Sequence, residues 1–181
     1  MSLDDWKSSK PRLLSKIENE GARILLHHWS EIYEREDRLP QRTDIDPLSF
    51  IKFTPYIWII KRVSKSEYIY RLVGDHIIEN FGMEIAGVYL HDFFSGEMLD
   101  AMMTFLNTVT DQKTAALHHG YRHLPTCDYP VQYERLSLPL ANQEGKVRYI
   151  IGYTFFYGIP DLAEAILGET SAFTHEEYYQ A

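Results

Sequence analysis

The sequence predicts an α+β domain: a five-stranded antiparallel sheet with helices on one face, preceded by a long N-terminal helix. Two observations lead to this prediction. Apolar residues between Arg12 and Asp37 recur at spacings of three and four, which is the helical period. Five stretches rich in β-branched and aromatic residues follow, two of them before and three after a cluster of helical segments.

The N-terminal helix is predicted over residues 12–37. Its apolar stripe contains residues at helical spacing: Leu14, Ile17, Gly21, Leu25, His28 and Ile32. At 1.5 Å of rise per residue, such a helix would be about 39 Å long, which is more than a small domain easily covers. Part of its apolar surface should therefore either meet a second chain or pack across its own domain. Amphipathicity alone does not distinguish the two.

A turn-rich connector is predicted over residues 39–55, because prolines recur there and cannot continue a helix. Within it, Asp46 and Pro47 predict the start of a short helix that reaches Phe53. Asp is a favoured N-cap residue, and Pro is a favoured first helical residue.

The sheet and the helices that cover it come next along the chain. Five stretches are predicted as strands: residues 56–60, 67–73, 114–123, 131–140 and 147–157. Three helical segments are predicted between the second and the third strand: residues 76–81, 89–94 and 96–112. A hairpin, a helical crossover and three further antiparallel strands can form a single sheet. A short helix is also predicted at residues 161–167.

The composition limits the classes of function. The chain has 181 residues, and 45% of them are hydrophobic, as in ordinary globular domains. Its 18 basic and 26 acidic residues give a net charge of −8, which disfavours nonspecific binding to nucleic acid. The longest apolar run, around residues 149–159, is shorter than the ~20 residues of a membrane helix. We therefore expect neither a nucleic-acid nor a membrane partner.

The cellular compartment and the division of the chain follow from similar arguments. A single cysteine, Cys127, favours a reducing compartment, and the acidic first residues do not read as a secretory signal. Cytoplasmic localisation is therefore expected. Three regions are predicted: an N-terminal helix at residues 1–38, one domain at 39–158 and a solvated acidic tail at 159–181.

Two segments of the chain resemble the PAS superfamily. Residues 81–94, FGMEIAGVYLHDFF, are similar to the helical PAS segment with the pattern G-x-E-[IL]-x-G-x-x-L-x-D-[LF]. Residues 139–153 are similar to the terminal PAS hairpin. Three shorter pieces, residues 39–47, 70–74 and 134–140, make the chain similar to a bacterial PAS-like subfamily once catalogued as a domain of unknown function.

This resemblance implies a PAS-like fold and a sensory or protein-interaction module that binds a small organic ligand or none. It implies signalling through a homodimer formed by the N-terminal helix, or through a separate signalling protein. It implies no defined reaction, and the sequence contains neither G-x-S-x-G nor a glycine-rich phosphate loop. The chain is therefore not expected to be an enzyme.

The resemblance also implies a ligand cavity between the sheet and the helices. Six residues are candidates for lining it: Arg71, Tyr70, His76, Tyr133, Arg135 and Tyr153. A guanidinium offers two parallel donors that match a carboxylate, so Arg71 and Arg135 are the candidates for holding one. The tyrosines would add apolar rings with polar tips. In the alternative, Arg71 pairs with an acid on the helices and the tyrosines are core residues.

A haem or flavin redox sensor is a second hypothesis. The axial histidine of haem-binding PAS domains generally comes from the long helix, but residues 96–112 contain no histidine, and His76 and His91 lie before them. The motif of flavin photosensors, N-C-R-F-L-Q, is absent, and Cys127 lies in a loop between strands. The cofactor therefore stays unknown.

A metal-assisted enzyme is the third hypothesis. It would use the segment His118–His123 together with Cys127, because imidazole and thiolate are zinc ligands. On a strand, His119 and His123 share one face and His118 lies on the other. A fourth zinc ligand is not evident, so a partly exposed polar strand is the favoured interpretation and no metal ligands are assigned.

Overall fold

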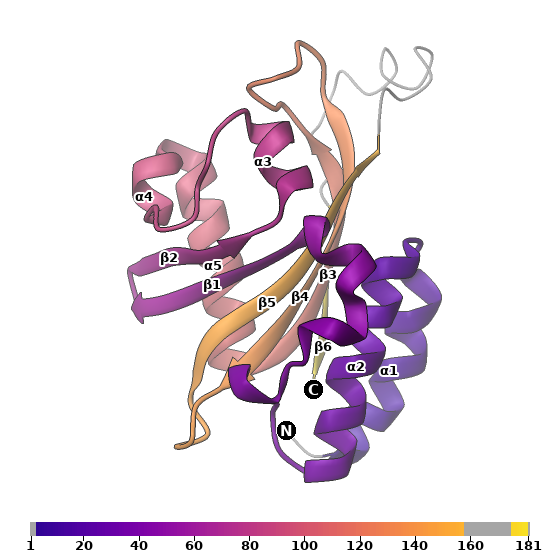
Figure 1. Ribbon diagram of the computed structural model, residues 1–181. Helices are drawn as coiled ribbons and strands as arrows, with labels where there is room; N and C mark the ends of the chain where they lie inside the picture. Colours follow the sequence, from indigo (N-terminus) through magenta and orange to yellow (C-terminus); the bar gives the residue numbers. More distant parts are fainter. Residues whose placement is uncertain (1–2, 158–174, 181) are drawn as a thin grey trace.

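The fold is an α+β domain built on one antiparallel sheet (Figure 1). The computed structural model describes residues 3–157 and 175–180. Within these residues the sheet has six strands: β1 (Ile57–Ser64), β2 (Glu67–Val73), β3 (Thr114–Arg122), β4 (Val131–Ala141), β5 (Val147–Tyr157) and β6 (His175–Gln180). Their order is β2-β1-β5-β4-β3-β6, and all neighbours are antiparallel. The predicted fold class is confirmed.

Helices cover both faces of this sheet (Figure 1). One face carries the N-terminal pair: α1 (Leu3–Lys16) and α2 (Glu20–Glu36). The other face carries three helices: α3 (Asp75–Phe81), α4 (Leu90–Phe93) and α5 (Gly96–Gln112). Two 3-10 segments connect α2 to β1: η1 (Arg42–Asp44) and η2 (Pro47–Tyr56). The expectation of helices on one face alone is corrected, because the N-terminal helices pack on the second face.

The sixth strand comes from the predicted tail. A solvated tail is predicted at residues 159–181, but β6 pairs with β3 along residues 114–119. Tyr179 on β6 is buried and joins the core beneath the N-terminal helices. Without β6, strand β3 would be an edge with unpaired backbone groups. The helix predicted at residues 161–167 lies outside the described residues.

The single helix predicted over residues 12–37 is two helices. Asn19 is the N-cap of α2, and its Oδ1 accepts a hydrogen bond from the Gly21 N–H at 2.9 Å. Glu134 of β4 stabilises the break, because its carboxylate accepts hydrogen bonds from the backbone N–H groups of Glu18 (2.7 Å) and Asn19 (3.1 Å). This buried carboxylate lies at the N-terminus of α2, where the helix dipole favours negative charge.

An aromatic core joins the N-terminal helices to the sheet. Trp6 of α1 and Trp29 of α2 are fully buried, with ring centroids 5.1 Å apart. Trp29 also stacks on Tyr33 at 5.3 Å and donates from Nε1 to the Pro139 carbonyl at 2.9 Å. The apolar stripe of these helices is therefore covered by their own chain, which is the second of the two expectations for it.

Alternate residues of β1 face opposite layers. Ile57 and Ile59 contact the core beneath the N-terminal helices, while Trp58 and Ile60 contact the core beneath α3 and α5. The Trp58 indole lies flat against Gly152 of β5, where an added Cβ would come within 2.1 Å of the ring. A glycine at 152 therefore creates the space for this large side chain.

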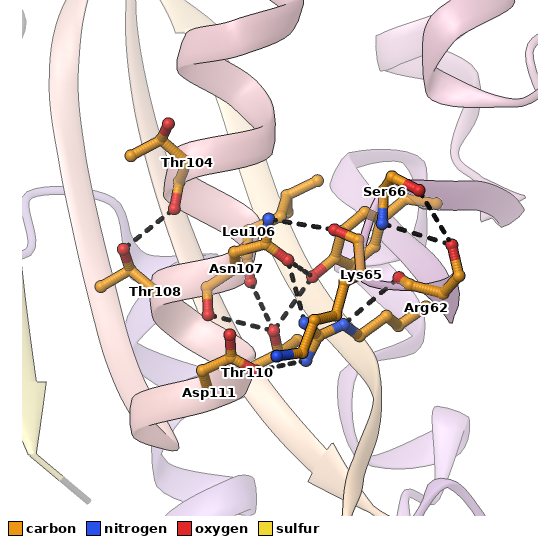
Figure 2. A network of polar contacts seen from close by, with 11 residues as sticks. Arg62, Lys65, Ser66, Thr104, Leu106, Asn107, Thr108, Thr110 and Asp111 are labelled. Carbon is orange, nitrogen blue, oxygen red and sulfur yellow. Dashed lines mark hydrogen bonds and ion pairs between the residues drawn. The ribbon is translucent and has the colours of Figure 1, made fainter.

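A polar network anchors the end of α5 to the hairpin of β1 and β2 (Figure 2). Arg62 donates to Asp111 Oδ1 at 2.5 Å and to Asn107 Oδ1 at 3.1 Å. The hydroxyl of Tyr68 donates to the same Asn107 oxygen at 3.0 Å and lies 3.0 Å from Thr110 Oγ1. Its bond with Arg62 lowers the pKa of the Asp111 carboxyl. The C-terminal half of α5 is thus fixed to the sheet.

Candidate ligand-binding cavity

A small cavity lies between the sheet and helices α3 and α5. Its volume is about 20 Å³, which is space for a single water molecule. The sheet supplies six residues of its wall: Trp58, Ile60, Tyr70, Arg135, Thr154 and Phe156. The helices supply the other four: Ile77, Phe81, Met102 and Leu106. The wall is therefore mostly apolar, with one charged side chain.

That charged side chain is Arg135, on the central strand β4. Only 6% of the residue is exposed. Its Nε donates to Thr154 Oγ1 at 3.4 Å, and its Nη1 lies 3.5 Å from the sulfur of Met102. The guanidinium also lies 5.3 Å from the centre of the Tyr133 ring. These are long or weak partners for a group with five N–H donors.

A second arginine, Arg122, lies near the first at the end of β3. Its guanidinium packs on the rings of Phe81 (5.1 Å) and Phe94 (5.4 Å). Its Nε is buried and has no hydrogen-bond acceptor among the described residues. Burial, and then the positive charge of Arg135, lower the pKa of Arg122 to about 10. The half-buried Arg122 and the buried Arg135 therefore form one positively charged region.

The structure brings three of the predicted site residues together on this face. Tyr70 and Arg135 line the cavity. Burial raises the pKa of the Tyr70 hydroxyl, and the charges of Arg135 and Arg122 oppose that rise. Tyr133 is buried beside Arg135, and its hydroxyl lies 3.1 Å from His118 Nε2.

Two other predicted residues lie away from the cavity. Arg71 is exposed on β2, because its neighbours Tyr68 and Tyr70 turn toward the α3–α5 layer and successive strand residues alternate. Tyr153 is buried on the opposite face, where its hydroxyl donates to Asn19 Oδ1 at 2.6 Å. Burial is the main cause that raises the pKa of Tyr153.

Arg122 is the residue of this face that sequence reasoning missed. It belongs to a predicted strand, and the signal that could have placed it was its even spacing along that strand. Arg122 pairs with Val131, and Gly120 of the same strand pairs with Tyr133. Residues at even spacing on β3 therefore share the face of Tyr133 and Arg135. Finding it required the register between β3 and β4.

His76, the sixth predicted residue, lies on α3 beside the cavity rather than in its wall. Its Nε2 accepts a hydrogen bond from the Phe156 N–H at 3.3 Å, and its ring stacks on Phe155. Burial lowers the pKa of His76, against the opposing charge of Glu79. The folded state therefore favours the neutral ring, which keeps Nε2 as an acceptor.

This arrangement predicts that the domain loses stability on mild acidification. His28 is a matched case, because its Nε2 accepts from the Asp46 N–H (3.2 Å) and burial again lowers its pKa. Unfolded histidines bind protons near pH 6.5, and these two bind them at lower pH when folded. The unfolded state thus takes up more protons, and stability should fall as the pH drops from 7.5 to 5.5.

Urea unfolding across that range measures the effect. The double variant His28→Phe/His76→Phe should show a clearly flatter dependence of unfolding free energy on pH. The depressed carboxyl pKa values of Asp44 and Asp111 act only at more acidic pH and do not enter this window. An equal slope in the double variant and the parent would contradict the assignment.

Haem and flavin do not fit the cavity as it stands. A cavity of about 20 Å³ is far smaller than the several hundred Å³ that such a cofactor fills. His91, one of the histidines considered for haem, is exposed and lies 3.7 Å from Asp92. These residues therefore support no reaction that uses haem or flavin.

The histidines of β3 lie on both faces of the strand. Among residues 3–157 and 175–180, no group of three or more His, Cys, Asp or Glu side chains is placed to hold a metal ion. His119 lies 3.0 Å from Glu134 on the face of the N-terminal helices. His118 lies on the opposite face, against Phe105 and Tyr133.

A wider groove of about 680 Å³ lies at another part of the surface. It is lined by the start of α1, the end of α2 and the turn between β4 and β5. It is open to solvent, and of its two basic residues Lys113 is exposed and Arg38 pairs with Asp44. The enclosed, charged cavity is therefore the better candidate site.

The family assignment follows from a direct match. The PAS_5 family model, described as a PAS domain, matches residues 17–155, which is most of the chain. The chain therefore belongs to the PAS domain family, whose members are sensory and ligand-binding modules. No curated protein sequence matches it significantly. No helix among the described residues is long and apolar enough to cross a membrane.

Several solved structures are similar to this chain. The PAS domain of BvgS from Bordetella pertussis is 17% identical, with 68% of this chain and 93% of that chain covered and a TM-score of 0.45. The LOV protein of Rhodobacter sphaeroides is 12% identical, with coverage of 66% and 73% and a TM-score of 0.45. VqmA from Vibrio cholera, in a complex with ligand and DNA, is 14% identical, with a TM-score of 0.44. The match covers 60% of this chain and about half, 49%, of the VqmA chain.

Proposed function

We propose that this chain is a sensory PAS module that binds a small organic ligand in the cavity between the sheet and helices α3 and α5. The observation that carries the proposal is the cavity itself. It has an apolar wall and a single buried cation, Arg135, within a domain of the PAS family. Ligand pockets are typically apolar enclosures with a few placed polar groups. Such a wall supports a binding module as the proposed role.

The helical layer is the element that would respond to the ligand. The buried residues of α5 all lie in its C-terminal half: Phe105, Leu106, Val109 and Thr110. That half is also the part anchored by Arg62 and Asp111 (Figure 2). The N-terminal half carries the exposed Met98 and the half-buried Met102. A ligand would therefore shift the equilibrium of α4 and the start of α5 while the end of α5 stays in place.

A separate protein is the signalling partner that we propose. A homodimer through the N-terminal helix remains the other candidate, but the buried residues of α1 and α2 already contact their own sheet. The large exposed apolar side chains among the described residues lie on other elements, for example Leu48 and Ile51 on η2 and Leu72 on β2. A partner that binds the layer of α3, α4 and α5 needs no apolar surface from α1 or α2.

Native mass spectrometry of the full chain with a library of small metabolites tests the ligand. A bound compound should slow hydrogen exchange in α4 and the start of α5. The variant Leu106→Phe fills the cavity, because Leu106 lines it and is 1% exposed, and should abolish binding. Overpacking costs about 1–3 kcal/mol, so circular dichroism must first show that this variant folds.

Leu72→Phe is the matched control, because it adds the same ring at an exposed position of β2. It should bind as the parent does. Equal binding by the parent and by folded Leu106→Phe would place the ligand elsewhere and contradict the proposal. The absence of exchange protection in α4 and α5 on binding would contradict the proposed response.

A further inference from the structure

Two arginines on the α3–α5 face of the sheet, the buried Arg135 and the half-buried Arg122, have no acidic partner among the described residues. Arg122 on β3 and Arg135 on β4 lie on neighbouring strands and on the same face. Among the described residues, no carboxylate forms an ion pair with either of them. By contrast, Arg62 pairs with Asp111 and Arg38 with Asp44. Buried charges in proteins are normally paired, so this absence calls for an explanation.

Their present contacts compensate these charges only in part. The rings of Phe81, Phe94 and Tyr133 provide aromatic faces at 5.1–5.4 Å. A cation over a ring is stabilised less than one that makes charge-assisted hydrogen bonds. The buried Nε of Arg122 has no acceptor at all among the described residues. The two like charges also repel each other, so the contacts among the described residues leave part of this cost uncompensated.

We propose that this face binds a small carboxylate, with the Arg135 guanidinium as its anchor and the Arg122 charge as its second attraction. The inference rests on the proposed function and names the chemical class of its ligand. Arg135 lines the cavity, and a guanidinium presents parallel N–H donors that match the two oxygens of a carboxylate. The hydroxyl of Tyr70, in the same wall, can donate a further hydrogen bond.

Met102 occupies the place beside Arg135 that the ligand carboxylate would take. Its sulfur lies 3.5 Å from Arg135 Nη1, where a carboxylate oxygen would make a much stronger hydrogen bond. The cavity holds only one water molecule as it stands, so a carboxylate has to displace this side chain. Methionine is flexible, and Met102 is half-buried on the less anchored half of α5. The apolar rings of Trp58 and Phe156 remain to contact the carbon part of the ligand.

Paired titrations with carboxylates and neutral amides of the same shape test this inference. The probes are acetate, butyrate and benzoate against acetamide, butyramide and benzamide, followed by NMR shifts of the backbone and of the arginine Nε–H groups. Each carboxylate should bind at least tenfold more tightly than its amide, which corresponds to the loss of about one charge-assisted hydrogen bond. The shifts should concentrate on β4, the start of α5 and the Arg135 side chain.

The variants Arg135→Met and Arg71→Met form a matched pair. Arg135→Met should weaken carboxylate binding at least tenfold, while Arg71→Met, which removes an exposed arginine from β2, should leave it unchanged. Without ligand, Arg135→Met should unfold at the same or a higher temperature than the parent, because it removes a buried unpaired charge. A purely structural arginine would instead lower that temperature. If Arg135→Met does not fold, Arg135→Lys is the second variant. It keeps the charge but loses the two parallel N–H donors of the guanidinium, and it should still weaken binding.

Several results would overturn the assignment. Equal binding of amides and carboxylates would show that charge does not contribute to binding. Equal shifts with inorganic phosphate or chloride would show that the site is not specific for carboxylates. Unchanged affinity in Arg135→Met would show that Arg135 does not hold the ligand. If a neutral metabolite binds and is blocked by Leu106→Phe, the proposed function stands and only the carboxylate assignment fails. If carboxylates bind through Arg135 but Leu106→Phe has no effect, the cavity of the proposed function is wrong.

Discussion

Trp29→Ala is expected to lower the free energy of unfolding of the whole domain by about 3–5 kcal/mol, the range for buried aromatic residues. Trp29 has no exposed surface, and its ring contacts both Trp6 and Tyr33. The substitution also leaves the carbonyl of Pro139 on β4 without its indole donor. For a chain of this size, the melting temperature should fall by about 10 °C.

The shape of the unfolding transition tests whether the N-terminal helices fold together with the sheet. The predicted division of the chain treats residues 1–38 as a flanking helix outside the domain at 39–158. The N-terminal helices, however, share one core with the sheet, so we expect one cooperative transition for the parent and for Trp29→Ala. The control His27→Ala changes an exposed residue of the same helix and should shift stability by less than about 0.5 kcal/mol. Two separate transitions in Trp29→Ala would instead support a helix that folds apart from the domain.

Local patterns in the sequence were sufficient for most of the elements. The bounds of α5 and β2 agree with the predicted segments, because each has a clear period and flanking turn residues. Asp46 does cap the segment that begins at Pro47, with its Oδ1 accepting from the Leu48 N–H at 3.0 Å. These elements are determined by residues that are near one another in the chain.

The missed features depend on residues that are far apart in the chain. The helical spacing of apolar residues passes from Ile17 to Gly21 across the break between α1 and α2, and the local mark of the break is Asn19, a favoured N-cap residue. The carboxylate that stabilises this break is 115 residues away from Asn19. Strand β6 is likewise defined by its pairing with β3, and its own sequence is acidic. Pairing between distant residues has little effect on the periodic spacing of apolar residues along the chain, so this spacing does not predict it.

The candidate site shows the same division. Arg135 and Tyr70 could be named from the sequence, and both line the cavity. Arg71 and Arg135 are the arginines that the sequence offers for holding a carboxylate, but Arg122 lies near Arg135 and Arg71 is exposed. Which face a strand residue occupies depends on the register between strands, and a shift by one residue exchanges the faces. Tyr153 lies on the opposite face for this reason.

Glu134→Ala should lower the free energy of unfolding by about 3 kcal/mol, because it removes a buried acceptor from several donors at once. The residue has no exposed surface. Its two oxygens accept hydrogen bonds from Glu18 N and Asn19 N, and Oε2 lies 3.0 Å from His119 Nε2. Without the carboxylate, the two backbone N–H groups at the break between α1 and α2 lose their acceptor.

The location of the effect distinguishes this role from a general loss of stability. Hydrogen exchange should accelerate first in α1 and at the start of α2, because the carboxylate holds the junction between them. Glu134→Gln keeps one acceptor oxygen and should lose less stability than Glu134→Ala. Glu144→Ala is the control, since that carboxylate is 69% exposed in the turn between β4 and β5 and pairs only with the exposed Lys146. Equal stabilities for Glu134→Ala and Glu144→Ala would show that the junction does not depend on the buried carboxylate, and the break would then be set by Asn19 alone.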